Sequence, residues 1–445
     1  MTRGFALICV LAAGIVAAAQ SSYTPAAEDE NAEFAKLRQE WARNLHEKRV
    51  EASVAAYAPE AEFIQPDGSH VRGTAALRAL YTAGTAIFDS ELIFFASHVD
   101  VAAGHATDAG QYREALTGRA DGKRQMIGGH YTTEYQRAAD GHWLIAKQSW
   151  TIEGAPIVLD LAPHPVVSLT FDDLPAAGSL PAGMNRTQIA TQLSGELKAA
   201  RMEGTYGMVN GSKLENDPDA QRALHVWLDA GMNIGSHTWS HPSLTASTAE
   251  AYIGDIEKNE APLAQYGQLR DWKWFRYPYL WEGDTLEKRH AVRGWLKEHG
   301  YRVAQVTLDF EDYAWNDAYG RCQAKNDAAS LQWLHDSYLA TAAEYIRLGR
   351  EEQLIAFGYE VPNVMLLHAT AFTTYMLPEL IEQLRGAGFS FESLAQVEND
   401  PVYAEDPDAA LKYGGTLPDQ FMDARHLPYP PVEPKPFDRL QNICK

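Results

Sequence analysis

The chain has 445 residues, of which 46% are hydrophobic and 22% are charged, and its formal net charge is -21 at pH 7. These percentages are ordinary for globular proteins and argue against disorder. The chain is longer than a protein with one typical hydrophobic core, so we expect two domains. The strong negative charge disfavours nucleic acid or an anionic membrane surface as the main partner, because both repel an acidic protein.

Residues 1–20 have the three parts of a secretory signal. Arg3 gives a short basic start, residues 5–19 are apolar, and Ala17–Ala19 offers a small-residue cleavage site before Gln20. A membrane anchor is the alternative, but it needs about 20 uninterrupted apolar residues, and this run is shorter. We therefore predict a signal that is removed and an exported protein, periplasmic or secreted, with no membrane attachment after cleavage.

Removal of the signal takes away Cys9 and leaves two cysteines, Cys322 and Cys444. In an oxidising compartment these two could form one disulfide that ties the C-terminus to the body of the protein. Two unrelated thiols are the alternative, and the sequence does not decide between them. A cysteine-based metal site is not expected, since two widely separated cysteines match no zinc spacing.

Residues 29–153 have the pattern of an α+β domain. Apolar residues between positions 29 and 58 recur at three- and four-residue steps, which predicts helix, and a short helix is expected over 75–81. Helices followed by a run of antiparallel-looking strands are typical of an α+β fold rather than of βαβ units. The strands are expected near residues 61–64, 92–101, 110–116, 126–137 and 143–152.

This stretch resembles the NTF2-like superfamily, in the branch of the SnoaL-like and ketosteroid-isomerase-like domains. The resemblance implies a curled sheet with a helix across it, which would form a conical apolar pocket. It also makes a homodimer through this domain plausible. Fold alone does not establish an activity, so we favour an accessory, non-catalytic role, with small-molecule chemistry as the alternative. The residues that carry the resemblance are Tyr57-Ala-Pro-Glu-Ala-Glu-Phe-Ile64, Pro66-Asp-Gly68, Val71-Arg-Gly73, Tyr131–Tyr135 and Trp143–Trp150.

Residues 160–400 alternate between strand-like and helical segments. This repeated alternation predicts an α/β domain whose mainly parallel sheet closes into a barrel. Residues 401–445 are rich in Pro, Asp and Tyr and are predicted to form an extended tail across the surface. The strand-like runs are Val166–Phe171, Gly204–Val209, Met232–Gly235, Trp274–Tyr279, Val303–Leu308, Val364–His368 and Phe389–Ala395.

Two pairs of polar residues follow buried strands of this domain. Asp172 and Asp173 come at the end of one strand, and His237 and His241 come after another. One carboxylate and two neutral imidazoles bind a hard or borderline divalent cation and leave positions open for water and substrate. The second carboxylate is then a candidate general base. Because parallel α/β folds place their sites at the carboxyl ends of the strands, we predict a reaction centre there.

The segment from Thr170 to about Ala395 resembles the NodB-homology polysaccharide deacetylases, carbohydrate esterase family 4, whose five motifs occur here in order. The resemblance implies a distorted (β/α) barrel that works as a metal-dependent hydrolase. The implied substrate is an N-acetylated amino sugar in an extracytoplasmic polysaccharide or oligosaccharide of the peptidoglycan or chitin type. The motifs are Thr170-Phe171-Asp172-Asp173, His237-Thr-Trp-Ser-His241-Pro242, Arg276-Tyr277-Pro278-Tyr279, Asp309-Phe-Glu-Asp312-Tyr313 and Leu366-Leu367-His368.

The resemblance also implies the identity of the cofactor and of the base. The cofactor is a divalent metal, zinc first, with cobalt or nickel as alternatives. Asp172 is implied to take a proton from a water molecule that the metal has acidified. The implied metal ligands are Asp173, His237 and His241.

The remaining motif residues are implied to assist the reaction. The backbone N–H of Tyr279 would stabilise the oxyanion, and His368 would protonate the leaving amine. Arg276 would pair with the base and hold it ionised. Either Asp309 or Asp312 would orient His368 or Arg276, and the sequence leaves open which aspartate does so.

One position departs from the family pattern, in which the fourth motif usually ends in Trp. Tyr313 stands there, Trp315 follows two residues later, and Trp239 and Trp281 are further candidates for a wall of the sugar groove. An O-acetyl esterase acting on xylan-like substrates is the alternative within the same family. A catalytically silent carbohydrate-binding protein is the alternative from another class, although the complete set of reactive residues argues against it.

Overall fold

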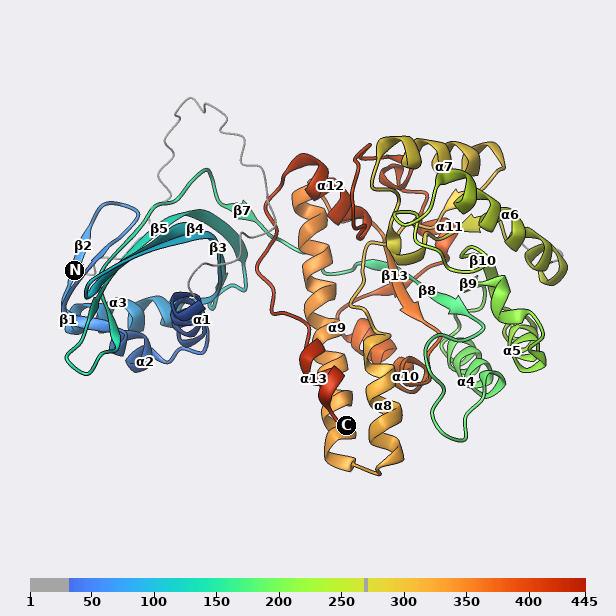
Figure 1. Ribbon diagram of the computed structural model, residues 1–445, viewed down its shortest axis with the longest axis horizontal. Helices are drawn as coiled ribbons and strands as arrows, with labels where there is room; N and C mark the ends of the chain where they lie inside the picture. Colours follow the sequence, from blue (N-terminus) through green and yellow to red (C-terminus); the bar gives the residue numbers. More distant parts are fainter. Residues whose placement is uncertain (1–31, 268–270) are drawn as a thin grey trace.

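The computed structural model describes residues 32–267 and 271–445, and its two seven-stranded sheets belong to two successive parts of the chain (Figure 1). Each part has its own buried hydrophobic core. The predicted export signal, residues 1–20, lies outside the described residues. Within those ranges no helix combines the length and the apolar character needed to cross a membrane.

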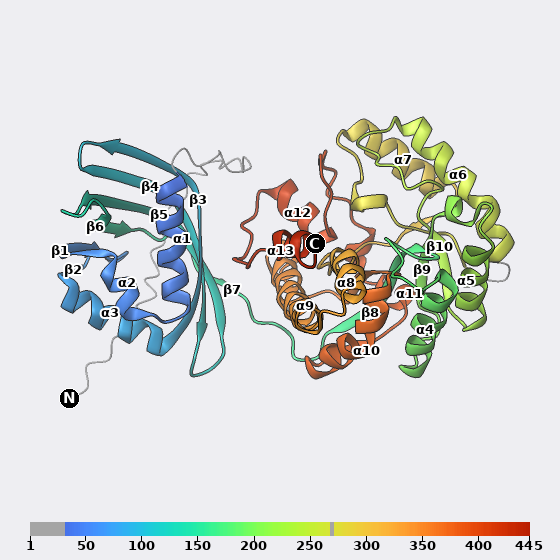
Figure 2. The same cartoon turned by 60° about the horizontal axis from the view of Figure 1, so that its bottom comes forward.

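The first sheet is mainly antiparallel and curls around helix α1, as Figure 2 shows. Its strand order is β2-β1-β6-β5-β4-β3, with β7 paired to β5, and only the β1–β6 pair is parallel. This is the conical α+β fold that the sequence predicts. The elements are α1 (Ala32–His46), α2 (Val50–Ala55), β1 (Tyr57–Ile64), β2 (His70–Arg72), α3 (Thr74–Ile87), β3 (Phe88–Ala102), β4 (His105–Gly118), β5 (Arg124–Arg137), β6 (Trp143–Trp150) and β7 (Ile157–Val158).

The interior of the cone is filled by the domain's own side chains. Trp41 stacks on Trp150 with ring centroids 5.8 Å apart, and the Tyr131 hydroxyl donates to Asp108, which also pairs with Arg38 at 2.6 Å. The cavity left beside these residues measures about 10 Å³, the lower limit for a single water molecule. This cavity is by itself too small for a small-molecule ligand.

The second sheet is parallel throughout, in the order β12-β11-β10-β9-β8-β13, with β14 also paired to β8. A bridge between Leu308 and Met365 joins the segment after β12 to β13 and closes the circle. The predicted distorted (β/α) barrel is therefore confirmed. Its strands are β8 (Val166–Leu174), β9 (Tyr206–Val209), β10 (Asn233–Ser236), β11 (Trp274–Phe275), β12 (Arg302–Val303), β13 (Asn363–His368) and β14 (Ser390–Phe391).

Helices surround this barrel and complete the alternation. They are α4 (Arg186–Ala199), α5 (Pro218–Asp229), α6 (Ala249–Tyr266), α7 (Leu286–Glu298), α8 (Ala314–Ala324), α9 (Ala328–Phe357), α10 (Ala371–Gly386) and α11 (Leu394–Val397). Helix α8 was not predicted, and the strand-like run 274–279 ends after two residues because Pro278 starts the short 3-10 helix η2 (Pro278–Leu280).

The C-terminal segment is less extended than predicted. It contains helices α12 (Leu417–Arg425) and α13 (Phe437–Asn442). Thr416 caps α12 in a capping box with Asp419, and Pro418 lies in the first turn, where its missing N–H costs nothing. A proline of this segment thus lies at the start of a helix, whereas the composition predicts an extended chain.

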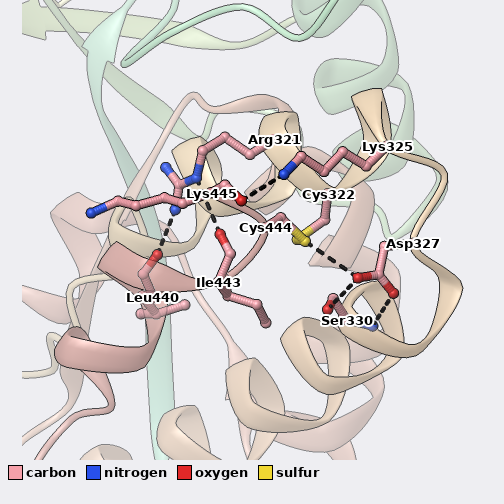
Figure 3. Close-up of a disulfide and its surroundings, with 9 residues drawn as sticks. All are labelled: Arg321, Cys322, Lys325, Asp327, Ser330, Leu440, Ile443, Cys444 and Lys445. Atoms are coloured by element: carbon pink, nitrogen blue, oxygen red, sulfur yellow. Dashed lines mark hydrogen bonds between the residues drawn. A yellow bond between two sulfur atoms is a disulfide. The ribbon is translucent and has the colours of Figure 1, made fainter.

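A disulfide between Cys322 and Cys444 fixes the end of the chain to α8 (Figure 3). Arg321 donates to the Leu440 carbonyl at 2.6 Å, and Lys325 donates to the Lys445 carbonyl at 2.6 Å. The sequence left this pairing open, and the structure decides it. A structural disulfide is typical of proteins that mature in an oxidising compartment.

Ion pairs with buried and half-buried members connect the two domains. Arg124 on β5 pairs with Glu351 on α9 at 2.6 Å, and Arg347 of α9 pairs with Glu91 of β3 at 3.2 Å. Arg124 also binds Glu91 and Arg347 also binds Glu351, so the four side chains form one closed cluster. Glu351 is fully buried and Arg124 is 9% exposed. Removing one partner of a buried charge is strongly destabilising, so the cluster holds the two domains in one relative arrangement.

Candidate active site and metal centre

The adjacent carboxylates Asp172 and Asp173 lie on the same side of β8, although neighbouring residues of a regular strand point to opposite faces. Asp173 has a φ of 69°, and the register between β8 and β9 shifts between Phe171 and Leu174. This β-bulge re-aims the side chains. As a result, Asp172 comes within 3.7 Å of His237, and Asp173 within 3.9 Å of His241.

Asp173, His237 and His241 form a donor set whose ligand atoms all lie within 4.8 Å of one another. The Nδ1–H of His237 donates to the Arg276 carbonyl at 2.8 Å, which leaves the Nε2 lone pair free for a metal. Burial lowers the pKa of each histidine to about 4, so both imidazoles are neutral at pH 7. Two neutral imidazoles and one carboxylate with open positions fit a divalent cation.

Lys213 is a neighbour of this donor set that the sequence analysis missed. Its Nζ donates to Asp173 Oδ1 at 2.8 Å and to the Asp173 carbonyl at 3.0 Å. Burial would raise the pKa of Asp173, but Lys213 and His237 together hold that pKa well below its usual range. The carboxylate is thus ionised and fixed in orientation. The sequence feature that could have identified Lys213 as a site residue is its position just after the carboxyl end of β9 (Tyr206–Val209).

Asp172 is almost fully buried, with 2% of its surface exposed. Arg276 Nη1 lies 3.3 and 3.4 Å from its two carboxylate oxygens, and Arg276 is itself held by the Ala304 carbonyl and by Thr170 Oγ1. Burial raises the pKa of Asp172, while Arg276 opposes that rise. The carboxylate is therefore more basic than one in water and still has a cationic partner.

His368 sits directly opposite Asp172 across the parallel pairing of β13 with β8. Its Nδ1–H donates to Asp312 Oδ1 at 2.7 Å, and its backbone N–H donates to Asp312 Oδ2 at 3.0 Å. Burial alone would lower the pKa of His368, but the buried Asp312 raises it to about 9. His368 is therefore an imidazolium at neutral pH with Nε2–H as its remaining donor.

The structure separates the two aspartates of the fourth motif. Asp312 contacts His368, whereas Asp309 accepts a hydrogen bond from the Glu311 backbone N–H at 2.7 Å, within its own turn. Burial raises the pKa of Asp309 to about 6. Of the two candidates, Asp312 is the one placed to orient His368, and the partner of Arg276 is Asp172.

Tyr279 has a left-handed backbone, with φ 62°, at the second position of η2. An amide there has no acceptor within the helix, so its N–H is available to a ligand. Tyr313, which stands where the family has Trp, packs edge-on against the His368 ring at 4.9 Å. The suggested substitute Trp315 is wrong for the groove, because it is fully buried and its Nε1 donates to Ser337.

The family comparisons agree with this geometry. Residues 161–304 match the family model described as polysaccharide deacetylase, and residues 28–148 match the SnoaL-like domain model. Each family model matches its own part of the chain, and both resemblances predicted from the sequence are confirmed.

The curated relatives match less than half of this chain. The peptidoglycan-N-acetylglucosamine deacetylase PgdA of Listeria monocytogenes is 26% identical over 181 residues, which make up 40% of this chain and 34% of that protein. The peptidoglycan-N-acetylglucosamine deacetylase of Bacillus cereus is 27% identical over 147 residues, or 33% of this chain and 46% of that protein. The chain thus spans between a third and a half of the length of these relatives.

Solved structures resemble each domain in turn. A chitin deacetylase from Colletotrichum lindemuthianum aligns with a TM-score of 0.37 and 20% identity, over 53% of this chain and 89% of that one. An NTF2-like superfamily protein from Salmonella enterica aligns with a TM-score of 0.26 and 18% identity, over 27% of this chain and 89% of that one.

Proposed function

We propose that this protein is a metal-dependent hydrolase that removes N-acetyl groups from amino sugars of an extracytoplasmic polysaccharide or oligosaccharide. One observation carries the proposal. A donor set for a divalent cation lies beside a buried carboxylate, Asp172, which is directly opposite a half-buried imidazolium, His368, across neighbouring strands. A cation site with a base and an acid beside it is suited to the hydrolysis of an amide.

Bound at Asp173, His237 and His241, a divalent cation would supply Lewis acidity for the acetyl carbonyl and for the attacking water. Zinc is the first choice, with cobalt or nickel as alternatives, since imidazole nitrogen suits all three. Asp172 takes the proton that the water loses as its oxygen attacks the carbonyl carbon. Arg276 keeps Asp172 ionised before that transfer and holds its two oxygens in place.

The other residues serve the second half of the reaction. The amide N–H of Tyr279 donates to the oxygen that gains negative charge, in the manner of an oxyanion hole. His368 gives its Nε2 proton to the sugar nitrogen as the carbon–nitrogen bond breaks, because that nitrogen leaves poorly as an anion. Asp312 keeps His368 charged and correctly turned. The products are acetate and a free amino sugar.

The protein is proposed to act outside the cytoplasm. The signal-like residues 1–20, the Cys322–Cys444 disulfide and the cell-wall substrates named for the bacterial relatives support this location. Self-association through the SnoaL-like domain stays a prediction, which light scattering of the purified protein tests.

The test is acetate release from chitooligosaccharide, peptidoglycan and acetylated xylan by the metal-loaded protein. We expect release from at least one of the first two, loss of activity with a chelator and recovery when zinc is restored. Asp172→Asn should keep one bound metal per chain and lose turnover by about a hundredfold or more, the usual contribution of a general base. Activity on xylan alone would establish the O-acetyl esterase instead. Binding of all three polymers without turnover would establish the silent binding protein.

A further inference from the structure

Three aromatic side chains form a row that begins at the donor set. We call Tyr279, Trp281 and Tyr413 the aromatic strip. The Tyr279 ring centroid lies 4.6 Å from that of His241, Trp281 lies 5.1 Å from Tyr279, and Tyr413 lies 5.4 Å from Trp281. Tyr279 and Tyr413 expose 54% and 59% of their surfaces. The strip therefore leads outward from the reaction centre and ends in an exposed ring.

Tyr413 comes from the C-terminal segment, outside the five motifs and outside the matched residues 161–304. It is held against the loop that carries Tyr279. The neighbouring Gly414 packs so closely there that an added Cβ would lie 1.7 Å from the Leu280 carbonyl oxygen, so only glycine fits. On the other side, Thr245 Oγ1 donates to the Lys412 carbonyl at 3.1 Å.

Both ends of this stretch, residues 406–417, are also anchored. Asp406 pairs with Arg289 at 2.6 Å and with Arg293 at 2.8 Å. At the other end the Leu417 N–H donates to the Val306 carbonyl at 2.6 Å. Figure 1 shows the red C-terminal segment passing between α12 and α7, beside the barrel. Tyr413 is thus held in place from both sides, and an ordered ring can bind a ligand at a low entropic cost.

A row of aromatic rings with exposed members at Tyr279 and Tyr413 is suited to a chain of sugar rings. The C–H face of a pyranose packs on an aromatic ring, while its hydroxyl groups stay at the edge in contact with water. The strip is continuous with the proposed site, so its occupant is a neighbouring sugar unit of the same substrate chain. A chitin-type substrate carries no charge, so the net charge of -21 does not repel it.

We propose that Tyr413 forms a binding subsite for a sugar unit adjacent to the one that is deacetylated, and that it thereby sets a preference for longer chains. This inference rests on the proposed function, because it deepens the description of the same site. Tyr413 makes no contribution to bond cleavage; it binds substrate at a distance from the reacting carbonyl.

The test compares kcat/KM on N-acetylglucosamine oligomers from the disaccharide to the hexasaccharide, for wild type, Tyr413→Ala and Tyr413→Phe. We expect Tyr413→Ala to lose about three- to tenfold on the long oligomers, the usual value of one aromatic contact, with no change on the shortest one hydrolysed. Tyr413→Phe, which keeps the ring, should behave as wild type. The matched control is Tyr359→Ala, which removes a 44% exposed tyrosine before the amino end of β13, at the opposite edge of the barrel.

A direct binding measurement separates this inference from the proposed function. Co-sedimentation with chitin and with peptidoglycan, in the presence of a chelator, reports binding without turnover. Weaker retention of Tyr413→Ala than of wild type supports the subsite even if no acetate is released from any substrate. Equal retention of Tyr413→Ala and wild type would overturn the inference. An equal loss of kcat/KM on every oligomer length would also overturn it, because a distorted Tyr279 loop would produce that result.

Discussion

Asp312→Asn is the substitution that tests most directly how the site holds a proton. Each oxygen of Asp312 is occupied: Oδ1 accepts from His368 Nδ1, and Oδ2 accepts from the His368 backbone N–H and from Thr373 Oγ1. In the variant the amide oxygen must stay toward the two donors at Oδ2. The amide NH2 then faces His368 Nδ1, where it can donate only to a neutral ring. The change therefore removes the negative charge and also favours the deprotonated imidazole.

The size of the effect follows from the pKa of His368, which Asp312 chiefly, and Asp172 and Asp173 in addition, raise to about 9 against the effect of burial. With that pKa, about nine-tenths of His368 is protonated at pH 8, whereas at an ordinary histidine pKa of about 6.5 only about 3% is protonated. We expect Asp312→Asn to lose about 30-fold in kcat at pH 8 and much less at pH 6. The alkaline limb of the pH profile should move toward neutral pH.

The same pair predicts a pH dependence of stability. The pKa of His368 is higher in the folded protein than in the unfolded chain. The stability that the His368–Asp312 pair contributes is therefore fully present below about pH 6.5 and is lost as pH rises through about 9. A shift from 6.5 to about 9 corresponds to about 3 kcal/mol. The free energies of unfolding of wild type and Asp312→Asn, from denaturant titrations, should therefore converge across that window.

The assay is initial-rate acetate release measured across this pH range with saturating substrate. The matched control is Asp309→Asn, the same chemical change three residues earlier, where the carboxylate binds the Glu311 N–H and not His368. Its alkaline limb should stay close to that of wild type. An unmoved alkaline limb in Asp312→Asn, or an equal movement in both variants, would refute the assignment of His368 as the proton donor held by Asp312.

Two further predictions concern the scaffold. Replacing Cys322 and Cys444 together by serine should lower the free energy of unfolding by about 2–5 kcal/mol, because the disulfide closes a loop with a sequence separation of 122 residues. Thermal unfolding of the double variant measures this loss, and a variant as stable as wild type would contradict the prediction. Arg124→Met leaves the buried Glu351 with one cationic partner, so it should lower the free energy of unfolding by about 3 kcal/mol and speed proteolysis between the domains. The control is Arg119→Met, which replaces an exposed arginine. Equal cleavage rates in the two variants would show that the cluster does not hold the domains together.

The sequence was sufficient for the fold classes and for the residue set at the barrel edge. Alternation of strands and helices requires parallel pairing, and parallel pairing brings the carboxyl ends of β8, β10 and β13 to one edge. That alone places Asp172, His237 and His368 near one another. Helix α8 escaped prediction because its N-cap, Tyr313, has no capping side chain to mark the start.

The finer assignments depend on backbone geometry that composition does not encode. Asp309 and Asp312 are equivalent in sequence, and only the turn at Glu311, which has a φ of 59°, decides which carboxylate reaches His368. Lys213 is a single cation in the short 3-10 helix Gly211–Leu214 and belongs to no motif. Tyr413 reaches the site from more than a hundred residues beyond the Tyr279 loop, a contact that no local pattern could reveal.

The left-handed residues of the site have a consequence for how far this protein can be stabilised. Asp173, Thr238, His241 and Tyr279 all have φ values between 60° and 69°, a conformation that glycine adopts without strain and that other residues adopt at a cost. A sequence selected for stability alone would carry glycine at these positions. At two of them the chain keeps the carboxylate of Asp173 and the imidazole of His241, so replacing these residues by glycine to relieve the backbone would remove two of the proposed metal ligands.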